Sequence, residues 1–575
     1  MPIHNADIAA VFEEIADLLE LDDANTFRIR AYRNAARTIQ ELGEDAREMV
    51  EKGDDLDELP GIGKDLAAKV VEIVQTGHCQ ALEKLRKQSA PGLTELMKIP
   101  GLGPKRVRAL YHELDIHTVE QLMRAAQDHR LRELSGFGEK TEKHILETLG
   151  THLKQDQRLK LAVAAQYADT LVEYLQRNPD VNKIVIAGSF RRSKETVGDL
   201  DILVTAKSSG NVMDHFVNYD EIDQVASKGK TRSTVVLRNH LQVDLRVVEP
   251  DSFGAALHYF TGSKAHNIAI RRRAQQRGLK INEYGVFKGQ KRVAGDTEES
   301  VFKSVDLPWI APELREDRGE IQAAEKKRLP DLVEVKDIRG DLHAHTKATD
   351  GKNTLEEMVN AAKDMGWDYV AITEHSKHLT VARGLDEKRL RQQIEQIDRL
   401  NDKLHGITVL KGIEVDILDD GSLDLPDDVL KELDLVVGAV HSKFNLSRAK
   451  QTERILRAMD NRYFTLLAHP TGRLIQQREP YDVDMGRVIH HAAERGCYLE
   501  LNCHPERLDL LDIYCQMAKE TGVLVSINTD SHNTNEFGNI RFGVGQARRG
   551  WLEAKDVLNT RTFAQLKRLL KKTRE

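Results

Sequence analysis

The chain has 575 residues, enough for three to five domains at roughly 100–200 residues each. Hydrophobic residues make up 40% and charged residues 31%, which supports packed cores and excludes global disorder. No apolar run reaches the roughly 18 residues of a membrane helix, and the first residues lack the pattern of a secretory signal. The four cysteines form no CxxC pair. We therefore expect a cytoplasmic, monomeric protein without a membrane partner, and the net charge of −7 confines any nucleic-acid-binding surface to local basic patches.

Residues 1 to about 150 have helical apolar spacing and repeat a Gly-x-Gly turn between helical segments. The three copies are Leu59–Lys64, Ile99–Lys105 and Leu134–Lys140. Glycines such as Gly61 and Gly63, or Gly101 and Gly103, permit a tight turn and leave backbone N–H groups exposed at the start of a helix, where phosphate is favoured. A single copy fits an ordinary glycine-capped turn equally well, but three copies favour binding of a DNA backbone. The turns resemble helix-hairpin-helix motifs.

Past residue 180 the pattern changes to strands, expected at Lys183–Ala187, Asp199–Thr205 and Leu241–Val248. Asp199 and Asp201 point to one face of their strand because side chains alternate, and Asp244 adds a third carboxylate from another strand. Three such carboxylates suit a pair of Mg²⁺ ions, which would activate a 3′-hydroxyl and bind a triphosphate. An isolated Asp-x-Asp is more often merely solvated. The upstream Gly188-Ser189 and the arginines that follow can hold phosphate, and they favour the nucleotidyl-transfer interpretation over a merely solvated face.

From about residue 5 to 315 the chain closely resembles the X-family DNA polymerases, on Gly188–Leu203, Val243–Val248, Tyr259–Asn267 and Ile281–Tyr284. The resemblance implies a palm and thumb in which Asp199, Asp201 and Asp244 hold the catalytic metals. It implies nucleotide contacts from Gly188, Ser189, Arg192, Gly198, Tyr259, Phe260, Gly262, Lys264 and Asn267. Tyr259 and Phe260 would line the sugar pocket, Asn267 would touch the incoming base, and Arg271 would approach the template minor groove.

The resemblance has departures and extends to the N-terminal helices. Gln242 replaces an arginine that bonds the catalytic carboxylates in the animal enzymes, and Lys264 replaces an aspartate beside the nucleotide. The stretch from Phe27 to Ala36 resembles the small 5′-phosphate-binding domain, in which Tyr32 would contact DNA. Lys69 stands at the position of a Schiff-base lyase lysine, although a solvated helix lysine is the better-supported reading because Asp65 replaces a neighbouring cation.

A third region begins near residue 337, where seven strand-like runs alternate with helical stretches and predict a parallel barrel of the TIM type. The strands are expected near Ile338 and at Tyr369–Ile372, Thr408–Ile413, Leu435–Val440, Tyr463–Ala468, Tyr498–Leu501 and Leu524–Ile527. Almost every strand ends in a candidate metal ligand, and active sites gather at these ends. The candidates are His343, His345, Asp350, His375, Glu414, His441, His469, Asp530 and His532.

This set resembles the polymerase and histidinol phosphatase (PHP) phosphoesterase family over about residues 337–570. The resemblance assigns His343, His345, Glu414 and Asp530 to one metal, Glu414, His441 and His469 to a second, and Asp350, His375 and His532 to a third. Imidazole with carboxylate suits Mn²⁺ or Zn²⁺, up to three ions, better than Mg²⁺. His504 lies outside that set as a candidate substrate contact, and Arg383 and Arg473 are candidate phosphate ligands.

Together the motifs resemble the bacterial- and archaeal-type X-family polymerases with a C-terminal PHP domain. The expected domains are 1–85 (lyase-like), 86–150 (helix-hairpin-helix), 151–250 (palm), 251–315 (thumb), 316–336 (linker) and 337–575 (PHP). The implied function is filling short gaps in gapped or nicked DNA from dNTPs during repair, with a 3′–5′ exonuclease, 3′-end-processing or AP endonuclease activity in the barrel. Alternatives are a barrel that is structural or cleaves only pyrophosphate or small phosphate esters, a template-independent nucleotidyltransferase, and a non-catalytic DNA-end tether. The basic run Arg271-Arg272-Arg273 with Arg277 and Lys280 is expected to reach the DNA backbone.

Overall fold

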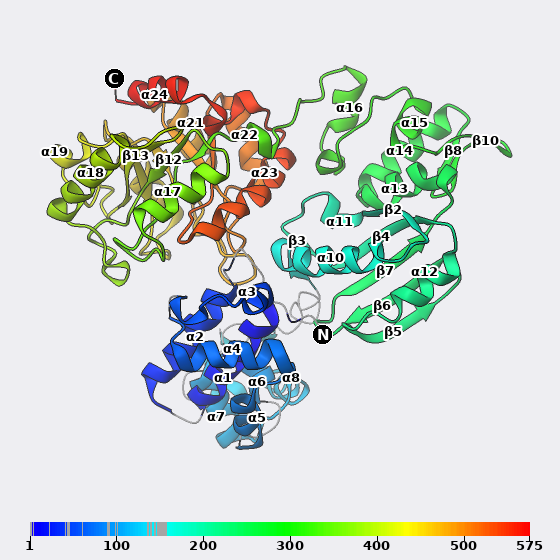
Figure 1. Cartoon of the computed structure of the whole chain (residues 1–575), viewed down its shortest axis with the longest axis horizontal. Helices are drawn as coiled ribbons and strands as arrows, with labels where there is room; N and C mark the ends of the chain where they lie inside the picture. Colours follow the sequence, from blue (N-terminus) through cyan, green and yellow to red (C-terminus); the bar gives the residue numbers. More distant parts are fainter. Residues whose placement is uncertain are drawn as a thin grey trace. The chain divides into compact units, whose positions relative to one another are not determined.

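The computed structural model describes residues 3–574 except 4, 22–23, 41, 43–45, 60, 89–92, 98, 100–101, 135–136, 139–140, 143–144 and 147–157. The chain divides into two compact units (Figure 1). The first contains residues 1–158 with the short segments 219–223 and 236–241, and the second contains the rest. Among the described residues, no helix combines the length and apolar character needed to cross a membrane.

The first unit is helical, as predicted, and its two apolar cores are separate. The first core lies under α1, α2 and α4, with Phe12, Ile15 and Val70 fully buried. The second core lies under the helices after residue 92. The helices are α1 (Asn5–Leu21), α2 (Thr26–Gln40), α3 (Ala46–Lys52), η1 (Leu56–Glu58), α4 (Lys64–Thr76), α5 (Gln80–Gln88), α6 (Leu93–Met97), α7 (Pro104–Leu114), α8 (Val119–Gln127) and η2 (Leu131–Glu133).

The palm expected after residue 151 is a five-stranded sheet in the order β2-β4-β7-β6-β5. The central strand β4 has a fully buried face of Leu200, Ile202 and Val204, which leaves its other face for polar side chains. The elements are β1 (Leu159–Lys160), α10 (Leu161–Gln176), β2 (Val181–Ile186), α11 (Gly188–Arg191), β3 (Thr196–Val197), β4 (Asp199–Ala206), α12 (Ser209–Phe216), β5 (Ile222–Lys228), β6 (Arg232–Leu237) and β7 (Gln242–Val247). All three predicted strands are present.

The next elements pack around Phe302 and Ile310 and form the expected thumb. They are η3 (Pro250–Ser252), α13 (Phe253–Thr261), α14 (Lys264–Gln276), β8 (Lys280–Asn282), β9 (Gly285–Lys288), β10 (Lys291–Ala294), α15 (Glu298–Ser304), η4 (Pro312–Leu314) and α16 (Glu320–Glu325).

The charged segment Glu313–Arg328, which overlaps the linker expected at 316–336, is folded and contains α16, so this part of the chain is not a linker. Arg315 and Glu320 are fully buried because Arg315 pairs with Glu298 and Glu320 accepts a 2.6 Å hydrogen bond from His266. Charges of this kind are buried only when paired. The segment therefore extends the thumb core towards the barrel.

The C-terminal region contains the predicted parallel sheet of seven strands, paired in sequence order from β11 to β17. Helices surround the strands on the outside, as Figure 1 shows for α17, α18 and α21. The strands are β11 (Gly340–Asp341), β12 (Tyr369–Ile372), β13 (Thr408–Asp416), β14 (Leu435–Ala439), β15 (Leu466–Leu467), β16 (Tyr498–Asn502) and β17 (Val525–Asn528). An isolated parallel bridge between Ala344 and Ser531 joins the loops after the first and last strands, so the sheet nearly closes.

Continuous apolar runs form these strands because both faces are covered, and every residue of β12, β14 and β17 is buried. The helical elements before, between and after them are η5 (Val335–Asp337), α17 (Leu355–Asp364), η6 (Thr380–Ala382), α18 (Glu387–Asn401), α19 (Asp427–Leu430), α20 (Arg448–Met459), α21 (Met485–Arg495), α22 (Asp512–Thr521), η7 (Thr534–Asn539), α23 (Ile540–Arg549), η8 (Ala554–Asp556), η9 (Leu558–Thr560) and α24 (Phe563–Lys572). The parallel arrangement brings the carboxyl ends of all seven strands to one mouth.

Candidate functional sites

The palm carboxylates lie on two neighbouring parallel strands. The register of β4 and β7 pairs Asp201 with Asp244 and Asp199 with Gln242. Paired residues on adjacent strands project to the same face about 5 Å apart. The sheet therefore brings together the three acidic residues that the sequence singled out.

Asp244 is held as a carboxylate by three donors. Thr234 Oγ1 donates at 2.5 Å, Gln242 Nε2 at 3.0 Å and Arg232 Nη2 at 3.1 Å. Burial alone would raise the pKa of Asp244, but these hydrogen bonds outweigh it and lower the pKa. Gln242, the departure from the family pattern, thus still bonds one of the predicted catalytic carboxylates, while Arg232 supplies a cation. Sequence reasoning missed Thr234 and Arg232, which stand on β6 with only strand alternation to mark them.

The surroundings of Asp201 shift its pKa in the opposite direction to that of Asp244. Burial first, and then the charges of Asp199 and Asp244, raise the pKa of Asp201 to about 7. The three carboxylates repel one another at this site. Divalent cations bound between them would relieve that repulsion, so the site fits such ions. The clusters whose ligand atoms all lie within 4.8 Å of one another, among the described residues, are in the barrel and do not include these three side chains.

The phosphate-binding motif stands directly beside the carboxylates. Gly188 begins α11 with φ +66°, and a Cβ at this position would lie 3.0 Å from Asp201 Oδ2. Only glycine allows both that backbone angle and that approach. Ser189 and Gly198 flank the same strands, at the start of α11 and just before β4. Arg192, at the end of α11, donates to the carbonyl of Thr261 at 2.8 Å and to Glu316 at 3.0 Å.

The thumb side chains of the expected nucleotide pocket form a stacked group. Tyr259 and Phe260 meet edge to face at 5.0 Å, and Arg271 stacks on Tyr259 at 5.6 Å. Asn267 donates to the carbonyls of Tyr259 and Gly262 at 2.7 and 3.1 Å. Lys264 is exposed in the first turn of α14.

The basic run expected to reach the DNA backbone extends from α14 to the start of β8. Arg273 pairs with Glu325, and Arg277 pairs with Asp306 at 2.9 Å, so carboxylates neutralise both side chains. Arg272 and Lys280 are exposed. The contact of this run with the DNA backbone thus stays a prediction, with Arg272 and Lys280 as its exposed cations.

One backbone hydrogen bond recurs in all three Gly-x-Gly segments. The equivalent hydrogen bonds Ile62 N to Leu59 O, Leu102 N to Ile99 O and Phe137 N to Leu134 O measure 3.0, 2.9 and 3.0 Å. Gly63 and Gly103 cap α4 and α7, and a Cβ at either would meet nothing within 4 Å. These caps face open space, as a phosphate site requires. Gly61 has φ +74°, while Gly101 lies outside the described residues.

Two N-terminal predictions receive little support. Tyr32 is 3% exposed and packs edge-on against Phe12, so its ring belongs to the helical core and not to a DNA-facing surface. Lys69 Nζ lies 2.6 Å from Asp65 Oδ1, in an ion pair with a carboxylate in place of the cation that would activate a lysine nucleophile.

The barrel ligands converge as predicted. Three clusters have ligand atoms all within 4.8 Å of one another: His345, Asp350, His375 and His532; His343, His345 and Asp530; and His375, Glu414 and His441. Glu414 is central, because its Oε1 lies 3.0 Å from His469 Nε2 and 3.2 Å from His441 Nε2, and its Oε2 lies 2.6 Å from His375 Nδ1. The grouping differs from the prediction: His345 and His375 each belong to two clusters, Glu414 is not grouped with His343, and His469 is in none of the three.

Several of these buried ring nitrogens make no hydrogen bond, namely His343 Nε2 and both ring nitrogens of His345. Unpaired buried polar atoms are costly. Their lone pairs point into a shared space, so the donor set fits metal ions, and imidazole with carboxylate suits Mn²⁺ or Zn²⁺.

Supporting carboxylates, which the sequence analysis missed, orient the histidines. Glu500 accepts from His343 Nδ1 at 2.6 Å and from the backbone N–H of His469 at 2.8 Å, and Asp416 lies 3.1 Å from His441 Nδ1. Such partners fix the ring orientation of metal-binding histidines. The signal for Glu500 was present, because a lone acid in the apolar run Tyr498–Asn502 must be buried.

The remaining barrel candidates, His504, Arg473 and Arg383, differ in their exposure and in their contacts. His504 is half-buried beside the mouth, and burial lowers its pKa to about 3. Arg473 is 6% exposed, donates to the carbonyl of Leu508 and pairs with Glu195 at 2.7 Å, so it is already committed to protein contacts. Arg383 is exposed, with φ +57°.

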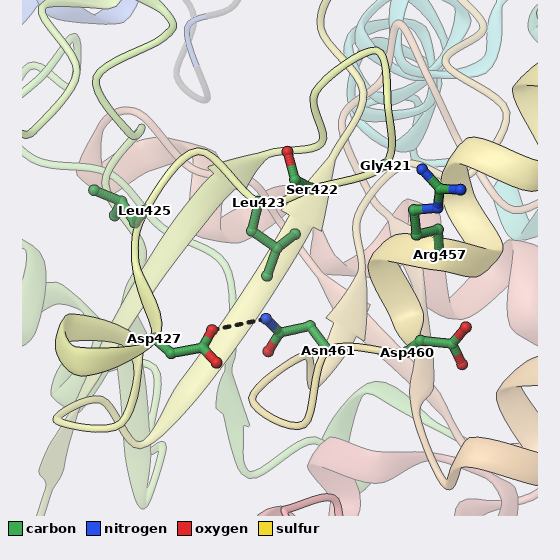
Figure 2. A pocket seen from close by; sticks show the side chains of 8 residues that line it. All are labelled: Gly421, Ser422, Leu423, Leu425, Asp427, Arg457, Asp460 and Asn461. Carbon is green, nitrogen blue, oxygen red and sulfur yellow. Dashed lines mark hydrogen bonds between the residues drawn. The ribbon is translucent and has the colours of Figure 1, made fainter.

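A cavity of about 420 Å³ lies elsewhere in the barrel domain, between the loop after β13, the start of α19 and the end of α20 (Figure 2). Asn461 donates to Asp427 across it at 2.9 Å. None of the predicted metal ligands lines it. The lining residues are Gly421, Ser422, Leu423, Leu425, Asp427, Arg457, Asp460 and Asn461.

Comparison with known proteins decides the family. Family models match for a helix-hairpin-helix domain (3–79), a helix-hairpin-helix tandem (93–151), the DNA polymerase beta palm (158–272) and thumb (256–316), and the PHP domain (341–504). The chain is 38% identical over 574 residues to the DNA polymerase/3′-5′ exonuclease PolX of Bacillus subtilis (strain 168), which covers 99% of this chain and 100% of that protein. The chain belongs to the PolX-type family X DNA polymerases.

Partial relatives match the two halves of this PolX-type chain separately. Rat DNA polymerase lambda is 28% identical over 288 residues, 45% of this chain and 48% of that protein. A probable phosphatase of Thermoanaerobacter sp. is 27% identical over 231 residues, 38% of this chain and 89% of that protein. The chain thus joins a family X polymerase to a PHP domain.

Proposed function

We propose that this PolX-type enzyme fills short DNA gaps at the palm and trims 3′ ends at the barrel. The observation that carries the polymerase half is the register of β4 and β7, in which Asp201 stands beside Asp244 with Gly188 against Asp201. Mg²⁺ bound by Asp199, Asp201 and Asp244 would lower the pKa of the primer 3′-hydroxyl and offset charge on the leaving pyrophosphate.

The chain's own residues arrange the reactants at the palm. Arg232, Thr234 and Gln242 fix the orientation of Asp244. Gly188 and Ser189 present the start of α11, and Arg192 a guanidinium, to the triphosphate. Tyr259 and Phe260 provide an aromatic wall for the sugar, and the N-terminal hairpins hold the DNA backbone.

In the barrel, the histidine and carboxylate clusters would hold Mn²⁺ or Zn²⁺, which supply Lewis acidity and an activated water for cleavage of a phosphodiester. Glu500 and Asp416 keep the ligand rings of His343 and His441 in place. Exonuclease activity is the assignment that the full-length similarity to the B. subtilis protein favours.

A second candidate for the barrel is a phosphatase that cleaves small phosphate monoesters. The similarity to a probable phosphatase over most of its length favours it. A 3′-hydroxyl primer and a 3′-phosphate primer separate the two activities. Shortening of the first indicates the exonuclease, while removal of phosphate alone indicates the monoesterase.

Two double variants test the whole proposal on one gapped substrate with Mg²⁺ and Mn²⁺. Asp199→Ala/Asp201→Ala is expected to abolish nucleotide incorporation, by at least about 10³-fold because the transition-state charge is no longer offset, and to spare degradation. His343→Ala/His345→Ala is expected to do the reverse. Loss of both activities in either variant would contradict two autonomous sites.

A further inference from the structure

The segment that joins the phosphate-binding helix α11 to the catalytic strand β4 is held by the barrel domain. Arg549, at the end of α23, donates from Nη1 to the carbonyl of Arg192 at 2.9 Å. The same guanidinium contacts Glu316 at 2.9 Å and Asp512 at 2.8 Å. Arg549 is 3% exposed, so its contacts are made inside the enzyme and not with solvent.

Glu316 connects that barrel arginine to the side chain expected to hold the triphosphate. Its Oε1 accepts from Arg192 Nε at 3.0 Å and from Arg549 Nη1 at 2.9 Å. Arg318 contacts Asp512 at 2.9 Å. Three guanidiniums therefore face two carboxylates, and the cluster keeps an excess positive charge beside the nucleotide pocket.

Packing reinforces the contact a few residues further along the loop. Gly545, one turn before Arg549 on α23, faces Ser193, and a Cβ on Gly545 would lie 2.9 Å from both Cβ and Oγ of Ser193. Glu195 then pairs with Arg473 of the barrel at 2.7 Å. The barrel thus contacts the loop through a hydrogen bond, an ion pair and a close-packed glycine.

We propose that the barrel domain positions the triphosphate-binding loop of the palm, with Arg549 as the positioning residue and Gly545 as the surface on which the loop rests. The inference rests on the proposed function, in which Arg192 holds the triphosphate. Arg549 orients Arg192 through its carbonyl and through Glu316. It also shares the charge of Glu316, which would otherwise neutralise Arg192 alone and weaken its attraction for phosphate. Burial and the Arg549 charge lower the pKa of Lys194, in keeping with the excess of positive charge there.

Arg549→Met tests the positioning role, because methionine keeps much of the stem volume but no charge or donor. On DNA with a one-nucleotide gap, the KM for the complementary dNTP is expected to rise about tenfold with kcat changed less than twofold, since a ground-state phosphate contact is weakened. The exonuclease rate should stay within twofold. Arg549→Lys retains the charge but cannot span three acceptors. Its KM for the dNTP should therefore lie between those of the wild type and Arg549→Met.

Arg548→Met is the matched control. Arg548 is the preceding residue on α23 and pairs with Glu313 at 2.6 Å, so its loss also breaks a contact between barrel and thumb. It touches neither Arg192 nor Glu316 in the contacts described for it. The KM for dNTP should therefore stay within twofold of the wild-type value. A rise equal to that of Arg549→Met would overturn the specific role of Arg549.

A second pair of variants moves the loop without removing any charge. Gly545→Ala places a methyl group against Ser193 and should raise the KM for dNTP several-fold. Ser193→Gly removes both atoms that the methyl group meets, and its φ of +52° suits glycine. The double variant Ser193→Gly/Gly545→Ala should thus regain a KM close to that of the wild type. Failure of this rescue, with Gly545→Ala folded, contradicts the proposal.

Arg192→Ala separates failure of this inference from failure of the proposed function. If the wild type incorporates nucleotides and Arg192→Ala raises the KM while Arg549→Met does not, the barrel does not position the loop and the polymerase assignment stands. If Arg192→Ala leaves the KM unchanged, the loop does not hold the triphosphate and the inference is overturned. Absence of incorporation by the wild type would overturn both.

Discussion

Two neighbouring carboxylates of the palm differ in what stabilises their charge. Asp244 receives three hydrogen bonds that lower its pKa, whereas burial and two adjacent carboxylates raise the pKa of Asp201 to about 7. Alternation along the strands predicted that both side chains share a face. It could not predict the difference, because the donors Thr234 and Arg232 come from β6, whose position beside β7 is a property of the fold.

Asp201→Asn should stabilise the metal-free enzyme in a pH-dependent way. A raised pKa means that the folded protein binds this proton more tightly than the unfolded chain, so stability is lost as pH rises from about 4 to about 7. Asparagine removes that loss. The melting transition of the palm, followed by calorimetry, is expected to rise by about 3 °C or more at pH 8, with little change at pH 4.

The control for this measurement is Asp251→Asn, because the Asp251 side chain is 83% exposed. It should shift the transition by less than about 1 °C at either pH, as surface substitutions do. An equal gain for Asp201→Asn at pH 4 and pH 8 would show that ionisation of Asp201 is not what destabilises the palm.

Glu500→Gln should weaken metal binding in the barrel although it replaces none of the predicted metal ligands. The carboxylate of Glu500 accepts from His343 Nδ1, and an amide in its place holds the ring less firmly and withdraws its negative charge. Removal of such partners typically costs about 10–100-fold in metal affinity or activity. The Mn²⁺ concentration for half-maximal exonuclease activity should rise by that order, while nucleotide incorporation stays unchanged. Glu520→Gln, at an exposed position of α22, should have no effect.

At the level of elements, the sequence predicted most of the barrel because its signals are local. Short apolar runs between helical stretches located the seven strands, although β11 and β15 are only two residues long. The prediction from the sequence was wrong where pairing between residues far apart in the chain decides whether a segment is folded. The segment Glu313–Arg328 has the composition of a solvated linker. Arg315 is nevertheless buried in an ion pair with Glu298, and the half-buried Glu316 pairs with Arg549, which lies 233 residues further along the chain. Opposite charges that far apart carry no periodic signal.

The hairpins allow a prediction about DNA binding at the same scale. Gly63 and Gly103 are helix N-caps with φ −80°, which any residue can adopt, and aspartate is a favourable N-cap. Gly63→Asp or Gly103→Asp should therefore keep the fold while placing a negative charge where phosphate is expected. Affinity for gapped DNA should fall several-fold in each, and the slope of log affinity against log salt concentration should decrease by about one.

Gly210→Asp provides the comparison for both hairpin variants. Gly210 lies in α12 of the palm, and a Cβ there also meets nothing within 4 Å. The added charge is the same, so a loss of affinity equal to that of the hairpin variants would mean that net charge, and not the hairpin phosphate contact, is responsible. DNA binding by titration at several salt concentrations distinguishes these outcomes.

For the whole molecule, two chemically different sets of predicted metal ligands share one chain. The predicted palm ligands are carboxylates alone, which suit the hard Mg²⁺ ion, while the predicted barrel ligands combine six histidines with three carboxylates. Both ligand sets were predictable because their residues stand at strand ends or alternate along a strand. The contact between the two domains through Arg549 and Arg192 was not, since it joins positions 357 residues apart.

The difference in ligands predicts that metal removal and replacement will separate the two activities. After treatment with a chelator and dialysis, the enzyme should lose both incorporation and degradation of a labelled primer in gapped DNA. Mg²⁺ alone should restore incorporation, because oxygen ligands complete its coordination, but should restore little degradation. Mn²⁺ should restore degradation in the wild type and in Asp199→Ala/Asp201→Ala, but not in His343→Ala/His345→Ala. Full recovery of degradation with Mg²⁺ at the same concentration would refute a barrel tuned by its imidazoles to softer ions.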